Sequence, residues 1–245
     1  MPAADETFLA GLLQGPAELL PISSSAHVGL LLQWRHPALQ GAARKEIEVA
    51  LHAGTALALA LARPPVRWRF LAAASLPPAL AGLAFERFVE ERLGTPRTVA
   101  AGLVAGAVAM VAADRTPARR TGSGVVDGAV LGVAQALALI PGISRSGATR
   151  TAARARGFGR REAAELSHEV ALPVLAGAAA LKGARLIGRR PPAENVGALA
   201  AGTVAAAAST WAALRLAREV APPLAPFAAY RVVLAAVILA VWRRH

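Results

Sequence analysis

Two hydroxyl-rich segments interrupt apolar stretches of this chain, and each carries side chains that could bind a phosphate group. The first runs from Gln14 to His27 with the sequence QGPAELLPISSSAH, and the second runs from Gln135 to Thr149 with the sequence QALALIPGISRSGAT. Polar and ionisable side chains inside apolar sequence are costly in lipid, so they usually mark a functional site. Their matching positions in two parts of the chain predict one site built from both segments.

The first segment offers a carboxylate, an amide, an imidazole and three hydroxyls. Gln14 and Glu18 are four residues apart, so on a helix they share one face, where the pair could hold a divalent cation. The other polar residues follow a helix-breaking proline, and they are Ser23, Ser24, Ser25 and His27. His27 is a candidate general acid, general base or nucleophile, and Ser24 is the alternative nucleophile. Capping of a helix start would also explain one of the serines.

The second segment has Arg145 at the position that corresponds to Ser24 in the first. A guanidinium presents a planar fork of donors that matches phosphate, and it keeps its charge. The remaining groups of the predicted anion site are the helix-start amides together with Ser144, Ser146, Gly147 and Thr149. The alternative for Arg145 is a side chain that reaches the membrane interface, as we expect for Arg150, Arg154 and Arg156. Both segments together suit a phosphate ester or anhydride, with Glu18 holding a cation or moving protons.

The composition predicts an integral membrane protein. Of the 245 residues 55% are hydrophobic, and the mean hydropathy is +0.45. Uncharged apolar runs recur at residues 70–85, 98–113, 128–144 and 195–214. An alanine-rich soluble helical protein is the alternative, but so many apolar runs are hard to bury without lipid. No Lys or Arg precedes Arg35, so a cleavable signal peptide is not expected.

Charge and cysteine content narrow the classes of partner. The net charge is +12, but only 4% of residues are aromatic and the basic residues cluster between the apolar runs. That distribution favours anionic lipid headgroups over nucleic acid. The chain has no cysteine, which excludes disulfides and thiolate metal ligands.

A repeat with a constant offset divides the chain into two halves, 1–121 and 122–245. Ser23 and Ser144 lie 121 residues apart, and so do the two copies of the tetrapeptide EVAL at 48–51 and 169–172. Each half begins with a broken helix hairpin, at 6–36 and 124–156. Three longer helices follow in each half, at 46–62, 66–90 and 96–113 and at 162–183, 193–217 and 223–243.

The expected fold is an all-α membrane domain in which both halves form one inverted repeat. It would have about six transmembrane helices and two re-entrant helix hairpins, because irregular backbone at membrane depth needs protein or water around it. Glycines spaced by four residues, at 102 and 106 and at 124, 128 and 132, predict close helix packing.

The strings QGPAELLPISSSAH and PGISRSGATR resemble the two signature motifs of the bacterial undecaprenyl-diphosphate phosphatase family, the bacitracin-resistance membrane proteins. EVALHAGTALA at 48–58 and later segments at 167–173 and 227–231 extend the likeness over nearly the whole chain. The resemblance implies a multi-pass protein of the bacterial inner membrane that removes the terminal phosphate from the C55 isoprenoid diphosphate. It thereby recycles the lipid carrier for cell-wall synthesis and confers bacitracin resistance.

The resemblance also implies a Mg²⁺ or Ca²⁺ requirement, a polyprenyl diphosphate substrate and a site that opens to the outer face. A homodimer is the one oligomer that we consider for the chain. Gln14 and Glu18 match the family's acidic-or-amide pair, although many members have Glu where this chain has Gln14. Ser25 replaces a frequent Thr. His168 and Glu169 stand where the family pattern has apolar residues. Arg231, inside the last apolar stretch, either pairs with an acidic residue or carries its charge for structural reasons.

Two other functions fit part of the pattern. A phosphatase of the acid phosphatase type would need a histidine soon after the Ser-Arg pair, and residues 146–157 contain none. A polyprenyl-phosphate flippase or other anion transporter would also use broken helices and an inverted repeat. Arg145 together with Glu18 and His27 favours hydrolysis, because anion passage does not need such a reactive set.

Overall fold

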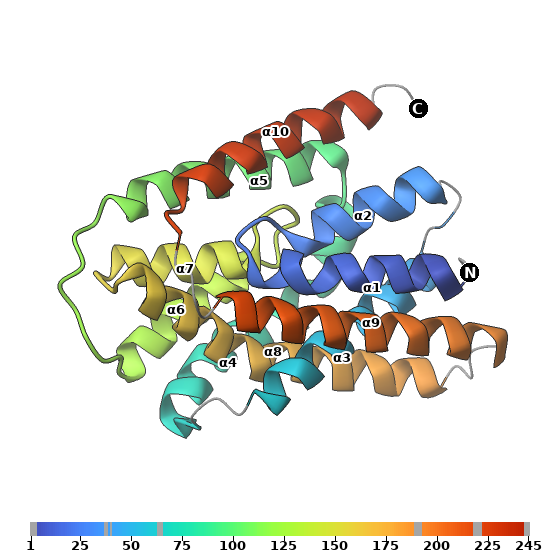
Figure 1. The fold of residues 1–245 in the computed structure, drawn as a ribbon, viewed down its shortest axis with the longest axis horizontal. Helices are drawn as coiled ribbons and strands as arrows, with labels where there is room; N and C mark the ends of the chain where they lie inside the picture. Colours follow the sequence, from blue (N-terminus) through green and yellow to red (C-terminus); the bar gives the residue numbers. More distant parts are fainter. Residues whose placement is uncertain are drawn as a thin grey trace. The chain divides into compact units, whose positions relative to one another are not determined.

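The computed structural model describes residues 4–36, 39, 41–62, 66–188, 193–217 and 222–242. Apart from one isolated bridge between Arg120 and Phe158, all regular secondary structure in these ranges is helical (Figure 1). The helices are α1 (Ala4–Leu19), α2 (Ser24–Arg35), α3 (Ala42–Leu61), α4 (Trp68–Arg92), α5 (Pro96–Asp114), α6 (Val125–Leu137), α7 (Arg145–Ala155), α8 (Arg160–Gly188), α9 (Ala193–Ala217) and α10 (Ala225–Trp242). The all-α prediction is confirmed for the described ranges.

Both predicted helix breaks are present. α1 ends at Leu19 and α2 begins at Ser24, while α6 ends at Leu137 and α7 begins at Arg145. Pro21 lies in the first break and the pair Pro141-Gly142 in the second. The helices end there because proline lacks the amide hydrogen that a continuing helix needs. The longer helices also lie where they were predicted, although α8 continues five residues beyond the expected end at 183.

Three helical segments among the described residues are long and apolar enough to cross a membrane, namely Trp68–Val89, Pro96–Asp114 and Asn195–Leu216. Val125–Leu137 and Ala225–Val241 are shorter apolar helices. Large apolar side chains on the three segments face outward, since Leu83 is 72% exposed, Val108 66% and Val204 65%. Such surfaces fit lipid better than water, in agreement with a multi-pass membrane protein.

The chain forms two compact units, and neither follows the boundary between the sequence halves. The first unit consists of residues 1–19, 27–64 and 171–219. In it α1 and α3 both pack along α9, and α1 lies beside α9 in Figure 1. Gly11 allows this approach, because a β-carbon there would lie 2.5 Å from the carbonyl oxygen of Gly202.

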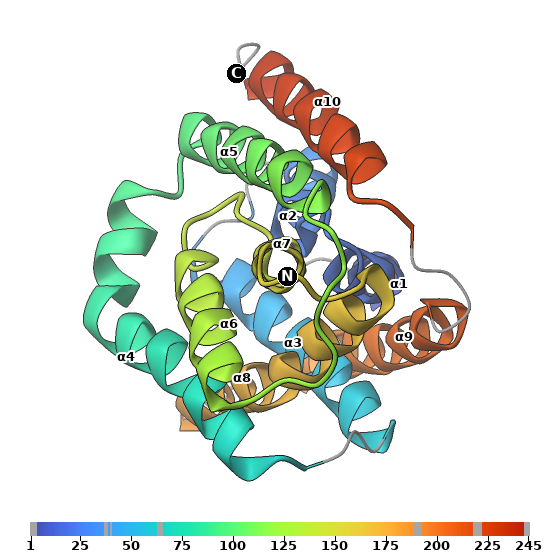
Figure 2. The same cartoon turned by 90° about the vertical axis from the view of Figure 1, so that its left-hand side faces the viewer.

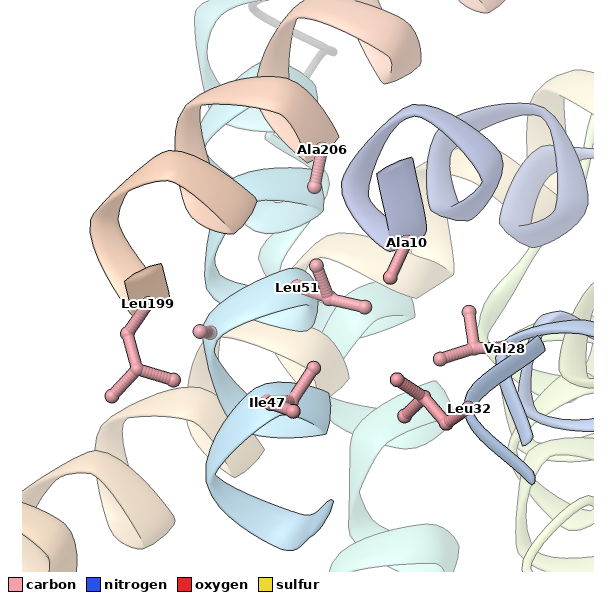
Figure 3. Close-up of a cluster of buried hydrophobic side chains, with 8 residues drawn as sticks. Ala10, Val28, Leu32, Ile47, Leu51, Leu199 and Ala206 are labelled. Atoms are coloured by element: carbon pink, nitrogen blue, oxygen red, sulfur yellow. The ribbon is translucent and has the colours of Figure 1, made fainter. Parts of the chain in front are cut away.

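The core of the first unit is aliphatic. Figure 3 shows Val28 and Leu32 of α2 beside Ile47 and Leu51 of α3, with Ala10 of α1 completing the contact. All five side chains are less than 3% exposed. This packing holds α1 and the later part of α2 together within the unit, on either side of the first break in the chain.

The second unit consists of residues 20–26, 65–170 and 220–245. α4 packs against α6, as Figure 2 shows, and α5 packs against α10. The predicted close approach of the small residues is confirmed at Gly132, where a β-carbon would lie 2.8 Å from the carbonyl oxygen of Ala74. It is wrong at Gly124, which faces open space.

The prediction that the α7 arginines reach the membrane interface is wrong for two of them. Arg150 and Arg154 are each only 5% exposed. Arg154 donates to the carbonyl oxygens of Phe158, Asp114 and Thr116. Arg156 is half-buried and pairs with the buried carboxylate of Asp127 at 2.9 Å. Arg154 and Arg156 therefore bind carbonyl and carboxylate oxygens of the protein, where lipid headgroups were expected.

Candidate phosphate-binding site

The start of α7 is built by the serines of the second signature segment. Ser144 is the N-cap, and its hydroxyl accepts a hydrogen bond of 3.2 Å from the Gly147 amide. The Ser144 and Ser146 hydroxyls are 3.1 Å apart, and Ser146 donates to the carbonyl oxygen of Leu20 at 2.8 Å. Because Ser146 uses its hydrogen for Leu20, Ser144 is the donor between the two serines. These hydroxyls join the second break to the backbone of the first.

Gly142 allows the second break to approach α5 closely. Its φ angle is +91°, in the left-handed region that favours glycine, and a β-carbon there would collide with the carbonyl oxygen of Val99. α7 begins at Arg145, three residues after this turn, and packs against α5. A helix N-terminus carries partial positive charge, so this point suits an anion.

Arg145 and Thr149 share a partner on α8 that sequence reasoning did not select. The Nη1 atom of Arg145 donates to the Ser167 carbonyl oxygen at 3.0 Å, and the hydroxyls of Thr149 and Ser167 are 2.7 Å apart. Both Thr149 and Ser167 are fully buried. The only sequence signal for Ser167 was that it begins one of the segments resembling the family.

Arg231 binds backbone oxygens, so its charge has a structural role. The alternative, pairing with an acidic residue, is wrong for the described part of the chain. Its side chain is 1% exposed and donates to the carbonyl oxygens of Leu103, Gly102, Gly142 and Pro21, at 2.9 to 3.4 Å. The hydrogen bonds and ion pairs of the described residues give it no carboxylate partner. Since Pro21 and Gly142 lie in the two breaks, one buried cation connects both of them.

The serines of the first segment also belong to the second unit. The Ser23 and Ser25 hydroxyls are 3.3 Å apart, and α2 begins at Ser24. Ser23 has a φ angle of +75°, and among the described residues it is the one non-glycine residue with positive φ. A strained conformation of this kind costs about 1–3 kcal/mol and is typical of ligand-binding turns.

Two replacements of Ser23 separate the cost of its backbone from the role of its hydroxyl. We expect Ser23→Gly to be more stable than Ser23→Ala by about 1 kcal/mol, because glycine adopts positive φ without strain. For a chain of this size the midpoint of thermal unfolding should differ by about 2–4 °C. Thermal unfolding in detergent measures the difference, and equal midpoints for the two variants would contradict it.

The other predicted residues lie in the first unit. The amide of Gln14 donates to the Glu18 carboxylate at 3.1 Å, and both side chains are less than 5% exposed. The same carboxylate oxygen is 3.7 Å from Nε2 of His52, a neighbour on α3. His27 is partly exposed near the start of α2. Gln14, Glu18 and His27 thus belong to one unit, and Ser23 to Ser25, Ser144 to Gly147 and Thr149 to the other.

The side chains around Glu18 offer few oxygen ligands for the predicted cation. No group of three His, Cys, Asp or Glu side chains that could hold a metal occurs among the residues described. Glu18 supplies a carboxylate and Gln14 an amide oxygen, which fits Mg²⁺ when substrate phosphates complete its coordination. A cation bound through protein side chains alone does not fit this set.

Comparison with known proteins agrees with the resemblance that the motifs suggested. The family model for bacitracin resistance protein BacA matches residues 62–237. The undecaprenyl-diphosphatase of Moorella thermoacetica is 34% identical, over 98% of each chain. That of Geobacter sulfurreducens is 36% identical, over 94% of this chain and 95% of its own. With a match across almost its entire length, the chain belongs to the BacA family of bacitracin resistance proteins.

Proposed function

We propose that this protein hydrolyses undecaprenyl diphosphate to undecaprenyl phosphate and inorganic phosphate in the bacterial inner membrane. That reaction would recycle the lipid carrier for cell-wall synthesis and confer bacitracin resistance. The observation that carries the proposal is the start of α7, where Arg145 and a helix N-terminus lie within an apolar helical protein. The names of the full-length relatives support the same substrate.

The proposed chemistry assigns the α7 turn to the diphosphate. Arg145 and the helix-start amides bind phosphate oxygens and neutralise the charge that develops on them. Glu18 and Gln14 would hold a divalent cation, which, when bound, would supply positive charge to neutralise phosphate oxygens. The bond between the terminal phosphorus and the bridging oxygen breaks, the lipid phosphate leaves, and water supplies the oxygen of the released phosphate. His27 and Ser24 are the candidate nucleophiles, and His27 is also the candidate proton carrier.

We also propose that the fold is an inverted repeat with six membrane crossings and two re-entrant hairpins. α2 and α7 begin 121 residues apart, which equals the offset of the sequence repeat. α1 packs on α9 in one unit and α6 packs on α4 in the other, and these pairs correspond under the repeat. The corresponding glycines Gly11 and Gly132 both approach a helix carbonyl. An odd number of crossings in each half would invert the second half.

Glu18→Gln tests the proposed activity in purified, detergent-solubilised protein. We expect phosphate release from undecaprenyl diphosphate to fall at least about 100-fold, because the amide lacks the charge that holds a cation or accepts a proton. A chelator should have a similar effect on the parent protein, and added Mg²⁺ or Ca²⁺ should reverse it. Glu165→Gln, an exposed position on α8, is the matched control.

Two outcomes would contradict the proposed function. A parent protein that releases no phosphate with either cation would not be a phosphatase, and lipid-carrier transfer across proteoliposomes would then favour a flippase. If the Glu18→Gln variant kept the parental activity, Glu18 would not be required for the reaction.

A further inference from the structure

Three consecutive residues of α8 contact the groups around the candidate site. Ser167 meets Arg145 and Thr149, His168 lies 3.3 Å from a guanidinium nitrogen of Arg150, and Glu169 pairs with Arg67. All of these residues belong to the second unit. This turn of α8 therefore contacts α7 through Ser167 and His168, and the start of α4 through Glu169.

The direction of the hydrogen bond between Thr149 and Ser167 follows from their partners. The Thr149 hydroxyl donates its one hydrogen to the backbone of α7, where the carbonyl oxygen of Arg145 at 2.9 Å is nearer than that of Ser146 at 3.3 Å. It can therefore only accept from Ser167, whose hydroxyl must be the donor. Since both hydroxyls are fully buried, water cannot replace the bond if the Ser167 hydroxyl is removed.

Ser167 thus contacts Arg145 in two ways. Its carbonyl oxygen binds the Nη1 atom directly, and its hydroxyl acts through Thr149 on the backbone carbonyl of Arg145 itself. One contact orients the guanidinium and the other supports the first turn of α7. A planar guanidinium binds phosphate well only in the correct orientation, so both contacts bear on anion binding.

An ion pair two residues further along fixes this turn of α8. Arg67 donates from Nε to the Glu169 carboxylate at 2.9 Å, and from Nη1 to the hydroxyl and carbonyl of Ser123 at 2.7 and 3.2 Å. It also lies 4.2 Å from the Phe70 ring centroid. The hydrogen bond to Glu169 raises the pKa of Arg67 above its usual value.

We propose that Ser167 is the positioning residue for Arg145, and that the Arg67–Glu169 ion pair holds Ser167 in register with α7. The proposal rests on the proposed function, because it assumes that Arg145 binds the diphosphate. It also gives a role to Glu169, at a position where the resemblance to the family led us to expect an apolar residue.

The test compares steady-state phosphate release in Ser167 variants. Ser167→Ala keeps the carbonyl contact and removes the hydroxyl that supports the first turn of α7, so it should lower kcat about 10-fold with a smaller change in KM, because Arg145 on that turn is then held less precisely in the transition state. Ser167→Thr keeps a hydroxyl and should recover most of the rate. Glu169→Gln should reduce kcat by a smaller factor, while Glu165→Gln, one turn earlier and exposed, should match the parent protein.

A double-mutant cycle separates positioning from general loss of structure. If Ser167 acts through Arg145, Ser167→Ala should change the residual rate of Arg145→Lys by less than about 2-fold. The proposal would be overturned if Ser167→Ala still lowered the rate about 10-fold in the Arg145→Lys variant. It would also be overturned if Ser167→Ala had no effect in the protein that retains Arg145. A parent protein without phosphatase activity would instead contradict the proposed function, so the two failures are distinguishable.

Discussion

Arg145→Lys is expected to fold like the parent protein and to release phosphate at least about 100-fold more slowly, a loss of about 2.7 kcal/mol in transition-state stabilisation. Lysine keeps the positive charge, but its ammonium is a point charge without a planar fork. The Ser167 carbonyl, which binds Nη1 of Arg145 at 3.0 Å, would also compete with the phosphate for the single ammonium group. We therefore expect geometry, rather than charge alone, to account for the loss.

The measurement is phosphate release from undecaprenyl diphosphate at saturating substrate, with thermal unfolding recorded on the same samples. Arg161→Lys is the matched control, since Arg161 is exposed at the start of α8. A rate for Arg145→Lys within about 3-fold of the parent would show that a positive charge is sufficient. The assignment of Arg145 as a bidentate phosphate ligand would then be wrong.

Arg231→Met is expected to lower stability by about 3 kcal/mol and to abolish activity. The guanidinium is buried and binds four backbone carbonyls, and methionine can bind none of them. Each buried carbonyl that loses its partner costs about 1–3 kcal/mol, although helical carbonyls keep another bond. Activity should be lost as well, because two of the carbonyls, at Pro21 and Gly142, belong to the two breaks.

Thermal unfolding in detergent should show a midpoint at least about 6 °C lower than that of the parent. Gly106 provides a specific control, because a β-carbon at this position would collide with the Arg231 guanidinium. Gly106→Ala should therefore destabilise the parent but have a smaller effect in the Arg231→Met background. Additive effects, or an Arg231→Met variant with parental stability, would contradict a structural role for this cation.

The helices and their breaks could be predicted from the sequence because their signals are local. Pro21 and Pro141-Gly142 mark the breaks, and the repeat offset of 121 residues identifies the corresponding elements. The assignment of the second signature segment to a helix start was also local, and Ser144 confirms it as the N-cap. Such features depend on neighbours within a few residues, which a sequence displays directly.

The partners of the buried cations could not be predicted, because they come from distant parts of the chain. Arg67 is one of the basic residues between the apolar runs, for which the sequence favoured lipid headgroups, but it pairs with Glu169, 102 residues away. Arg231 binds Pro21, 210 residues away. An arginine pattern is the same whether the acceptor is a lipid phosphate or a protein carbonyl, so only the tertiary structure distinguishes them. The contact between Ser167 and Arg145 was missed for the same reason.

The anchoring of α7 at both ends has a consequence for how the proposed site would meet its substrate. Ser146 and Arg231 secure its beginning, while Arg154 and Arg156 secure its end. Because this eleven-residue helix is restrained at both ends, its conformational entropy is lost during folding. Substrate binding then does not have to offset that loss. Any closure that accompanies catalysis would therefore have to occur in elements that move around a stationary α7.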